Sequence, residues 1–308
     1  MEKENNYMVC VRCFTFNQAQ YIEDALNGFC MQQTNFPFVC VIVDDASVDG
    51  EPGVISNYLE RHFNLDDTAI VRREETDDYQ MVFAKHKDTL NCFFAVYYLK
   101  YNHYSIRKSK FPYLTEWLNK KYEALCEGDD YWTDPFKLQK QVDFMESHPD
   151  CSLCFHANNN LYSSGIMKEY HPRKRKRFYS AVDVILGGGD FMATNSMFYR
   201  LTLLDENNKP DFWKKAPIGD GPCMLYFASK GKIGYIDDVM SVYRKNSVGS
   251  WTSRQDSFDA YKRHYILIQK MFDEYDQYTN RKYHFAIVVK KIRNGLSFYK
   301  NVLINKLK

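Results

Sequence analysis

Two apolar segments that each lead into adjacent aspartates constrain this chain most. Residues 38–43 lead into Asp44 and Asp45, and residues 122–126 lead into the acidic turn 127–130. Each apolar segment is typical of a buried strand, and a helical pattern follows each turn. In an open α/β sheet, ligands bind outside the carboxyl ends of the strands. We therefore expect both acidic turns to face one crevice.

The first part of the chain alternates strand and helix patterns. Residues 8–14 and 38–43 read as strands, 21–31 and 54–63 as helices, and 69–71 as a short third strand. This order predicts an α/β fold, with parallel strands joined by right-handed crossovers and flanked by helices. The first strand is not followed by G-x-G-x-x-G, which argues against a dinucleotide-dependent oxidoreductase.

The segment 66–120 is interpreted as an insertion at the edge of the sheet. Within it, we expect a loop over residues 77–87, a helix over 89–98 and a further helix over 111–119. Later elements follow in regular order: a helix over 136–146, a strand over 151–156, a loop or hairpin over 165–178, a helix over 180–186, strands over 194–199, 232–236 and 239–244, and a helix after Asp220.

Composition sets the broad class. The 308 residues are 45% hydrophobic, which is enough for a large core, and the net charge of +2 gives no argument for a nucleic-acid partner. The nine cysteines form no zinc pattern, so we expect reduced thiols. Residues 1–7 are polar and no apolar run is long enough for a membrane span. We expect a cytoplasmic protein without a signal peptide.

Two interpretations of the acidic turns stay open at this level. Aspartates in turns bond to their own backbone and begin helices, which alone would explain them. Alternatively, carboxylates at a strand end are hard oxygen ligands for Mg²⁺ or Mn²⁺, and such an ion keeps positions open for substrate phosphates.

Three segments in order resemble the family 2 glycosyltransferases, which are inverting enzymes with a GT-A fold. They are residues 14–17 (Phe-Thr-Phe-Asn), 43–50 (Val-Asp-Asp-Ala-Ser-Val-Asp-Gly) and 127–132 (Glu-Gly-Asp-Asp-Tyr-Trp). The resemblance covers roughly residues 7–65 and 120–250. It is closest to bacterial members that build capsule, lipopolysaccharide or other surface glycans.

The resemblance implies a role for each matching residue on the donor side. Asp45 would contact the base of the nucleotide, in a pocket lined by Phe14 and Phe16. Asp130 would bind the metal, Mn²⁺ or Mg²⁺, and Asp129 would lie by the donor sugar and ribose. Glu127 stands where the family more often has Asp.

The resemblance also implies a general base, Asp220, in the turn 218–222. A helix N-cap is the structural alternative for this residue, and both roles are compatible, because a helix N-terminus favours an ionised carboxylate. Asn195 lies in a strand near the acceptor-side residues of the family.

Residues 243–251 resemble the loop that covers the diphosphate. Arg244 and Lys245 would neutralise phosphate. Asn246 stands where the family commonly has His, so a second protein ligand for the metal is in question. Trp251 would belong to the same loop or only anchor it.

The resemblance places a catalytic domain at 1–255 and a helical extension at 256–308. The extension has helical periodicity and is rich in cations: Lys290, Lys291, Arg293, Lys300, Lys306 and Lys308. Either two helices pack on the catalytic domain, or a basic amphipathic helix lies on the inner face of an anionic membrane. A lipid-linked acceptor would lie there.

The expected activity is transfer of a sugar from a nucleoside diphosphate sugar to a hydroxyl of a glycan or lipid-linked acceptor. Uridine is the expected nucleoside of the donor, because it is the most frequent one in the family. Two alternatives remain. A nucleotidyltransferase would need a basic, glycine-rich loop after the first strand, and residues 14–17 contain neither Gly nor Lys. The second alternative is a glycan-binding protein with an impaired catalytic site. It remains because Asn246 replaces the His that is common in the family.

Overall fold

The computed structural model describes residues 7–117, 121–189, 191–205, 208–246 and 258–306. The strands are β1 (Val9–Thr15), β2 (Phe38–Asp44), β3 (Arg72–Glu75), β4 (Tyr79–Lys85), β5 (Cys92–Leu99), β6 (Tyr122–Leu125), β7 (Tyr131–Trp132), β8 (Cys151–Tyr162), β9 (Met167–Tyr170), β10 (Phe178–Tyr179), β11 (Phe198–Arg200) and β12 (Lys232–Lys245). The helices are α1 (Ile22–Cys30), α2 (Glu51–His62), α3 (Lys137–Ser147), α4 (Ala181–Gly187), α5 (Asp211–Lys214), α6 (Asp220–Lys230), α7 (Phe258–Tyr278) and α8 (His284–Lys306), with short 3₁₀ turns η1 (Phe111–Trp117), η2 (Thr194–Ser196) and η3 (Leu201–Leu203).

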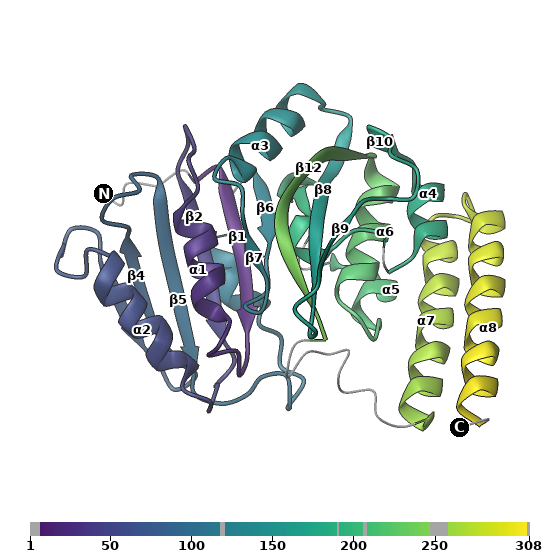
Figure 1. Cartoon of the computed structure of the whole chain (residues 1–308), viewed down its shortest axis with the longest axis horizontal. Coiled ribbons are helices and arrows are strands. Elements are labelled where there is room, and N and C mark those ends of the chain that lie inside the picture. Colours follow the sequence, from purple (N-terminus) through teal and green to yellow (C-terminus); the bar gives the residue numbers. More distant parts are fainter. Residues whose placement is uncertain (1–6, 118–120, 190, 206–207, 247–257, 307–308) are drawn as a thin grey trace.

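The described strands form one mixed sheet in the order β10-β12-β8-β11-β6-β1-β2-β5-β4-β3, with β7 on β12 and β9 on β8 (Figure 1). Strand β1 lies between β2 and β6 and is parallel to both. The chain therefore proceeds from β1 to one side through β2 and β5, and later returns to its other side at β6. That reversal is a topological switch point, and a crevice for ligands is expected at its carboxyl edge.

The central strands are buried on both faces, which explains their unbroken apolar sequences. In β2, Phe38, Cys40 and Ile42 pack in the core under α1 and α2. The alternate residues Val39 and Val41 pack on the opposite face, in a second core with the 3₁₀ turn η1. Successive side chains of β2 thus enter two different cores, one on each face of the sheet.

The C-terminal helices α7 and α8 stand side by side at one end of the molecule, next to α4, α5 and α6 (Figure 1). Met271, Phe272 and Tyr275 of α7 and Ile287 of α8 are buried in a third core with residues of α6. The predicted helical extension is therefore present, and it packs against the sheet domain. Among helices in the described ranges, none combines the length and apolar character needed to cross a bilayer.

The segment 66–120 differs from the prediction in three ways. The helix predicted over 89–98 is wrong, because Cys92–Leu99 forms β5, parallel to β2. The loop predicted over 77–87 contains β4, and the third parallel strand is β5 rather than 69–71. Residues 92–99 are apolar throughout, so their periodicity cannot separate a strand from a buried helix. Their aromatic and β-branched content was the better guide.

Smaller differences concern the later strands. The strand predicted over 151–156 continues to Tyr162 as β8, and the two predicted over 232–236 and 239–244 are one long strand, β12. In the predicted strand 194–199, the first residues form η2 and only Phe198–Arg200 are extended. All nine cysteines are free and buried.

Two helix glycines give a paired test of this packing. A Cβ on Gly28 of α1 would lie 2.8 Å from the backbone nitrogen of Trp132, whereas a Cβ on Gly53 of α2 would meet nothing within 4 Å. We expect Gly28→Ala to lower the free energy of unfolding by about 1–3 kcal/mol, because β7 cannot move away freely. Gly53→Ala should be neutral or stabilising by up to about 1 kcal/mol. Denaturant titration of both variants measures the difference, and equal effects would contradict the described α1–β7 contact.

Candidate functional site

The acidic turn after β6 is fixed against the end of β1. The backbone N–H of Cys126 donates to the carbonyl of Arg12 at 3.1 Å, and that of Gly128 donates to the carbonyl of Phe14 at 3.3 Å. A side chain at Gly128 would collide with the hydroxyl of Thr15. Only glycine lets the turn approach β1 this closely, so the acidic residues that follow are held at the switch point.

Strand β7 then brings the two aspartates to the end of β12. Tyr131 pairs with Val242, and Asp130 accepts a hydrogen bond of 2.8 Å from the backbone N–H of Arg244. The Asp130 side chain is buried, and Asp129 is half-buried. Residues 129–130 and Arg244, which are far apart in sequence, are thus in direct contact.

The guanidinium of Arg244 is held in this place by acidic and aromatic partners. It donates to the carbonyl of Asp129 at 2.7 Å and forms an ion pair with Asp24. It also lies 4.8 Å from the ring centre of Tyr21 and 4.6 Å from that of Tyr131. These contacts hold the guanidinium in one position.

Carboxylates crowd at this edge. Burial first, and then the charge of Asp129, raise the pKa of Asp130 well above its usual value. The pKa of Glu127 is raised to about 7, mainly by burial and also by the charges of Asp129 and Asp220, against the lowering effect of Arg12 and Lys110. The charge of Asp220, in a distant part of the sequence, thus acts on a residue of the acidic turn.

A divalent cation fits this donor set. Asp129 and Asp130 offer hard oxygen ligands, and a positive ion would relieve their mutual repulsion. Within the described ranges, no three His, Cys, Asp or Glu side chains are gathered to hold a metal by themselves. An ion held here would therefore depend on one or two protein carboxylates and on oxygens from a substrate or water.

Asp45 is buried and bound by the segment that follows β5. Its carboxylate accepts hydrogen bonds from the backbone N–H groups of His103 at 2.6 Å and Tyr104 at 3.2 Å, and it pairs with Lys110 at 2.8 Å. Asn102 donates to the Asp45 carbonyl at 2.9 Å. The segment interpreted as an insertion of unknown role thus forms a wall beside the predicted base pocket.

Phe14 and Phe16 are half-buried at the end of β1. The ring of Phe14 packs edge-on against Phe111 at 6.1 Å, and the cations of Arg12 and Lys110 each lie 5.3 Å from its centre. An aromatic surface edged with cations therefore adjoins Asp45, which suits a nucleotide base and its phosphates.

Asp220 begins α6 as its first helical residue, with Gly219 as the N-cap. The structure thus does not use Asp220 as the N-cap. Its carboxylate instead accepts a 2.8 Å hydrogen bond from the N–H of Gly221 and is half-buried. The first turn of a helix favours the charged form of such a carboxylate.

The remaining predicted residues have different positions. The Asn195 side chain is buried, donates to the carbonyl of Val242 at 2.8 Å and accepts from the Ser241 hydroxyl at 3.0 Å, so it joins η2 to β12. Lys245 is half-buried near the ring of Tyr243, and Asn246 is exposed with a φ of 60°. Trp251 lies outside the described residues.

Sequence reasoning missed a polar network that joins the first two loops. Glu51, buried at the start of α2, accepts hydrogen bonds from the Thr15 hydroxyl, from the Gln18 N–H at 2.9 Å and from the Ser47 hydroxyl at 2.8 Å. The N–H of Asn17 donates to Ser47 at 2.8 Å. A Glu in the first turn of a helix was the available signal.

No family model matches the chain. Uncharacterized proteins of Mycobacterium bovis and Mycobacterium tuberculosis are 33% identical over 243 residues, or 78% of this chain. The chain spans 59% of the length of these relatives.

Two solved structures share the fold. The Staphylococcus aureus TarS fragment 1–349 with UDP-GlcNAc has a TM-score of 0.60 at 17% identity, over 95% of this chain and 73% of that one. The mannosyltransferase from Pyrobaculum calidifontis with GDP-Man and Mn²⁺ has a TM-score of 0.53 at 13% identity, over 94% and 74%. The mixed sheet with flanking helices is thus a fold of known glycosyltransferases.

Asp44 provides a test of the described electrostatics. Burial raises its pKa to about 6, and one of its carboxylate oxygens has no hydrogen-bond partner among the described residues. The folded protein thus binds this proton more tightly than the unfolded chain does. Ionised Asp44 therefore lowers the free energy of unfolding above pH 6. This loss of stability decreases as the pH falls and is absent below the ordinary aspartate pKa of about 3.9.

We expect Asp44→Asn to raise Tm at pH 8 and to give a much smaller gain at pH 4. Thermal unfolding at both pH values measures this. The exposed Asp66→Asn serves as a control that should leave the pH dependence of Tm unaltered. A gain at Asp44 that is equal at both pH values would contradict the raised pKa.

Proposed function

We propose that this chain is an inverting glycosyltransferase of the GT-A type that uses a nucleoside diphosphate sugar. One observation supports the proposal: Asp129 and Asp130 lie in the turn after β6, at the switch point of the sheet, and the charge of Asp220 acts on Glu127 in the same turn. A fold shared with sugar-nucleotide-binding transferases supports it.

The donor nucleotide would lie between Phe14, Phe16 and Asp45. Each carboxylate oxygen can accept two hydrogen bonds, so the bonds that Asp45 receives from His103, Tyr104 and Lys110 leave one acceptor position for the N–H of a base. We propose a UDP-sugar as the donor. A solved neighbour bound to UDP-GlcNAc supports uridine, and one bound to GDP-Man supports guanosine as the second choice.

Asp130, with Asp129 beside it, would hold Mn²⁺ or Mg²⁺. When bound, such an ion stabilises negative charge on the leaving diphosphate. Arg244 and Lys245 would contribute further positive charge at the end of β12, where Arg244 is already oriented by Asp24 and Tyr131.

Asp220 would act as the general base. Its carboxylate takes the proton from an acceptor hydroxyl as that oxygen attacks the anomeric carbon. The bond from this carbon to the diphosphate oxygen breaks on the opposite face, and its electron pair leaves with the diphosphate. The configuration inverts in a single displacement, with no covalent enzyme intermediate.

Two substitutions separate these roles. Asp220→Asn should reduce sugar transfer at least about 100-fold, because a carboxamide cannot accept the proton, while donor affinity stays nearly unchanged. Asp130→Ala should weaken donor binding in Mn²⁺ as well. Diphosphate release from a panel of sugar nucleotides measures turnover, and calorimetry with UDP, GDP and Mn²⁺ measures binding.

Asp211→Asn is the matched control, because Asp211 also begins a helix but is exposed and pairs with Lys215. It should retain full activity. Wild-type turnover by Asp220→Asn would refute the assignment of the base. Donor binding without turnover of any donor in the wild-type protein would favour the impaired binding protein instead.

We propose residues 1–255 as the catalytic domain, with a role in bacterial capsule, lipopolysaccharide or other surface-glycan synthesis, and 256–308 as an extension that contacts the membrane. Helix α8 contains no Asp or Glu and carries an exposed apolar stripe at spacings of three and four residues. The stripe is formed by Phe285, Val288, Ile292, Leu296, Tyr299 and Leu303. Exposed Arg293 and Lys300 complete a surface suited to an anionic bilayer at the inner face of the plasma membrane.

Vesicle sedimentation tests this contact. The protein should bind vesicles that contain phosphatidylglycerol more than pure phosphatidylcholine vesicles, and high salt should weaken the binding. Leu296→Ser should reduce it, because Leu296 is 68% exposed within the stripe, and Leu90→Ser should not, because Leu90 is equally exposed (73%) between β4 and β5. Equal loss in both variants would contradict a specific role for α8.

A further inference from the structure

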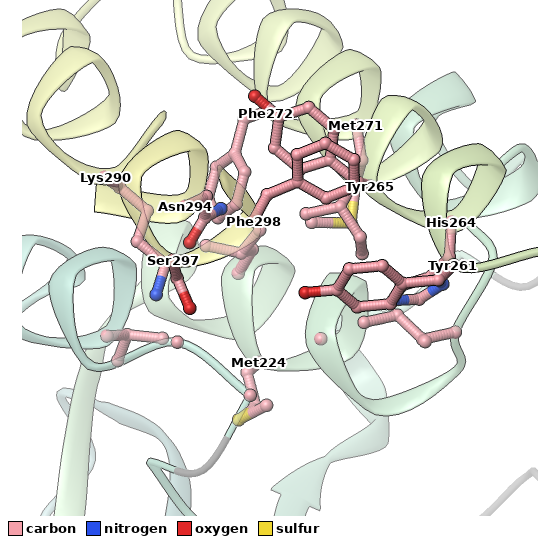
Figure 2. A pocket seen from close by; sticks show the side chains of 17 residues that line it. Met224, Tyr261, His264, Tyr265, Met271, Phe272, Lys290, Asn294, Ser297 and Phe298 are labelled. Atoms are coloured by element: carbon pink, nitrogen blue, oxygen red, sulfur yellow. The ribbon is translucent and has the colours of Figure 1, made fainter. Parts of the chain in front are cut away.

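A cavity of about 280 Å³ lies between α6 and the helix pair α7–α8, outside the acidic site (Figure 2). Its lining is mainly apolar, with side chains from all three helices. The principal ones are Met224, Ile268, Met271, Phe272 and Phe298. This volume is close to the lower bound for small-molecule sites, about 300 Å³, and an apolar lining with few polar groups is typical of them.

One wall of the cavity is rigid. The ring of Phe298 stacks on that of Tyr265 at 4.4 Å and on that of Tyr261 at 5.3 Å, with interplanar angles of 16° and 17°. Because these aromatic side chains fix one another, the cavity cannot close by a simple rotamer change on this side. An apolar ligand would meet a preformed surface.

The described cavity lining contains a cation and polar side chains on one side and no acidic side chain. Lys290, Asn294 and Ser297, all from α8, lie together on one side in Figure 2. The described lining includes no Asp or Glu. Lys290 passes over Gly188, where any side chain would collide with its ammonium group. A ligand with an apolar body and a negatively charged group matches this arrangement.

The cavity also adjoins the proposed base. Ile218 and Gly221 line it, and Asp220 lies between them in the turn that begins α6. A molecule with its chain in the cavity would therefore have one end near the Asp220 turn.

We propose that this cavity binds the hydrocarbon chain of a phosphate-bearing amphiphile, with the phosphate near Lys290. Binding itself does not depend on the proposed function. Only the identification of this ligand class with a lipid-linked acceptor rests on it, because the cavity is lined by Ile218 and Gly221, on either side of the proposed base in the sequence.

Calorimetric titration of the full chain with octyl phosphate, below the concentration at which it forms micelles, tests the site. Octanol and inorganic phosphate are the comparison ligands. Octyl phosphate should bind, octanol should bind about 10-fold more weakly, which corresponds to about 1.4 kcal/mol, and inorganic phosphate should not bind measurably.

Matched variants locate the ligand. Ile268→Trp, which fills the cavity, should weaken both octyl ligands at least about 10-fold, whereas Ile266→Trp, at an exposed position on the same helix, should not. Lys290→Gln should weaken only octyl phosphate, by about 10-fold. Lys291→Gln is its control, because Lys291 pairs with Asp273 outside the cavity.

A measurement on the wild-type protein tests the site even if the variants do not fold. Methyl signals of ¹³C-labelled Met224 and Met271 should shift on addition of octyl phosphate. Absence of binding, equal binding of inorganic phosphate, or no change in either methyl signal would each overturn the proposal. Donor titration and diphosphate release are measured separately, so this failure would leave the proposed transferase activity untouched.

Discussion

The site depends on the parallel pairing of β1 with β2 on one side and with β6 on the other. This pairing places three loops at one edge: residues 16–21 after β1, 45–50 after β2 and the turn 126–130 after β6. Buried polar bonds from Glu51 and the close approach of Gly128 to Thr15 then fix these loops against one another. No single loop could hold an anionic ligand, but the three together form a polar edge above a dry core.

Like charge is the second constraint, and it follows from the first. Burial, reinforced by the charge of Asp129, raises the pKa of Glu127 and of Asp130, so each of these two groups lowers stability when it is ionised. Arg12 offsets part of this cost at Glu127, and Arg244 does so at Asp130. In the proposed function, a cation that binds with the donor would offset this negative charge further.

Local sequence patterns predicted most of the central fold and the place of the acidic turns. Strands buried on both faces are recognised as unbroken apolar runs, and the turns are recognised by the aspartates that follow these runs. These patterns failed for β5, where an unbroken apolar run has no period to read. They also missed the wall that Asn102, His103 and Lys110 build around Asp45, since those contacts span 57 to 65 residues. Asn195 has a buried cross-strand role that its position in a predicted strand could not reveal.

Helix α8 shows why the extension should be considered with the site rather than apart from it. Its inner residues, Ile287 and Phe298 among them, are buried against α7 and around the cavity, whereas Leu296 and Tyr299 face outward. One helix thus offers an apolar surface on each side, and a helix that needed only to pack on the protein would keep its outer face polar. The cavity on the inner side continues to the turn of Asp220. If α8 lies on a bilayer as proposed, an amphiphile that enters the cavity would meet apolar contacts on both sides of α8.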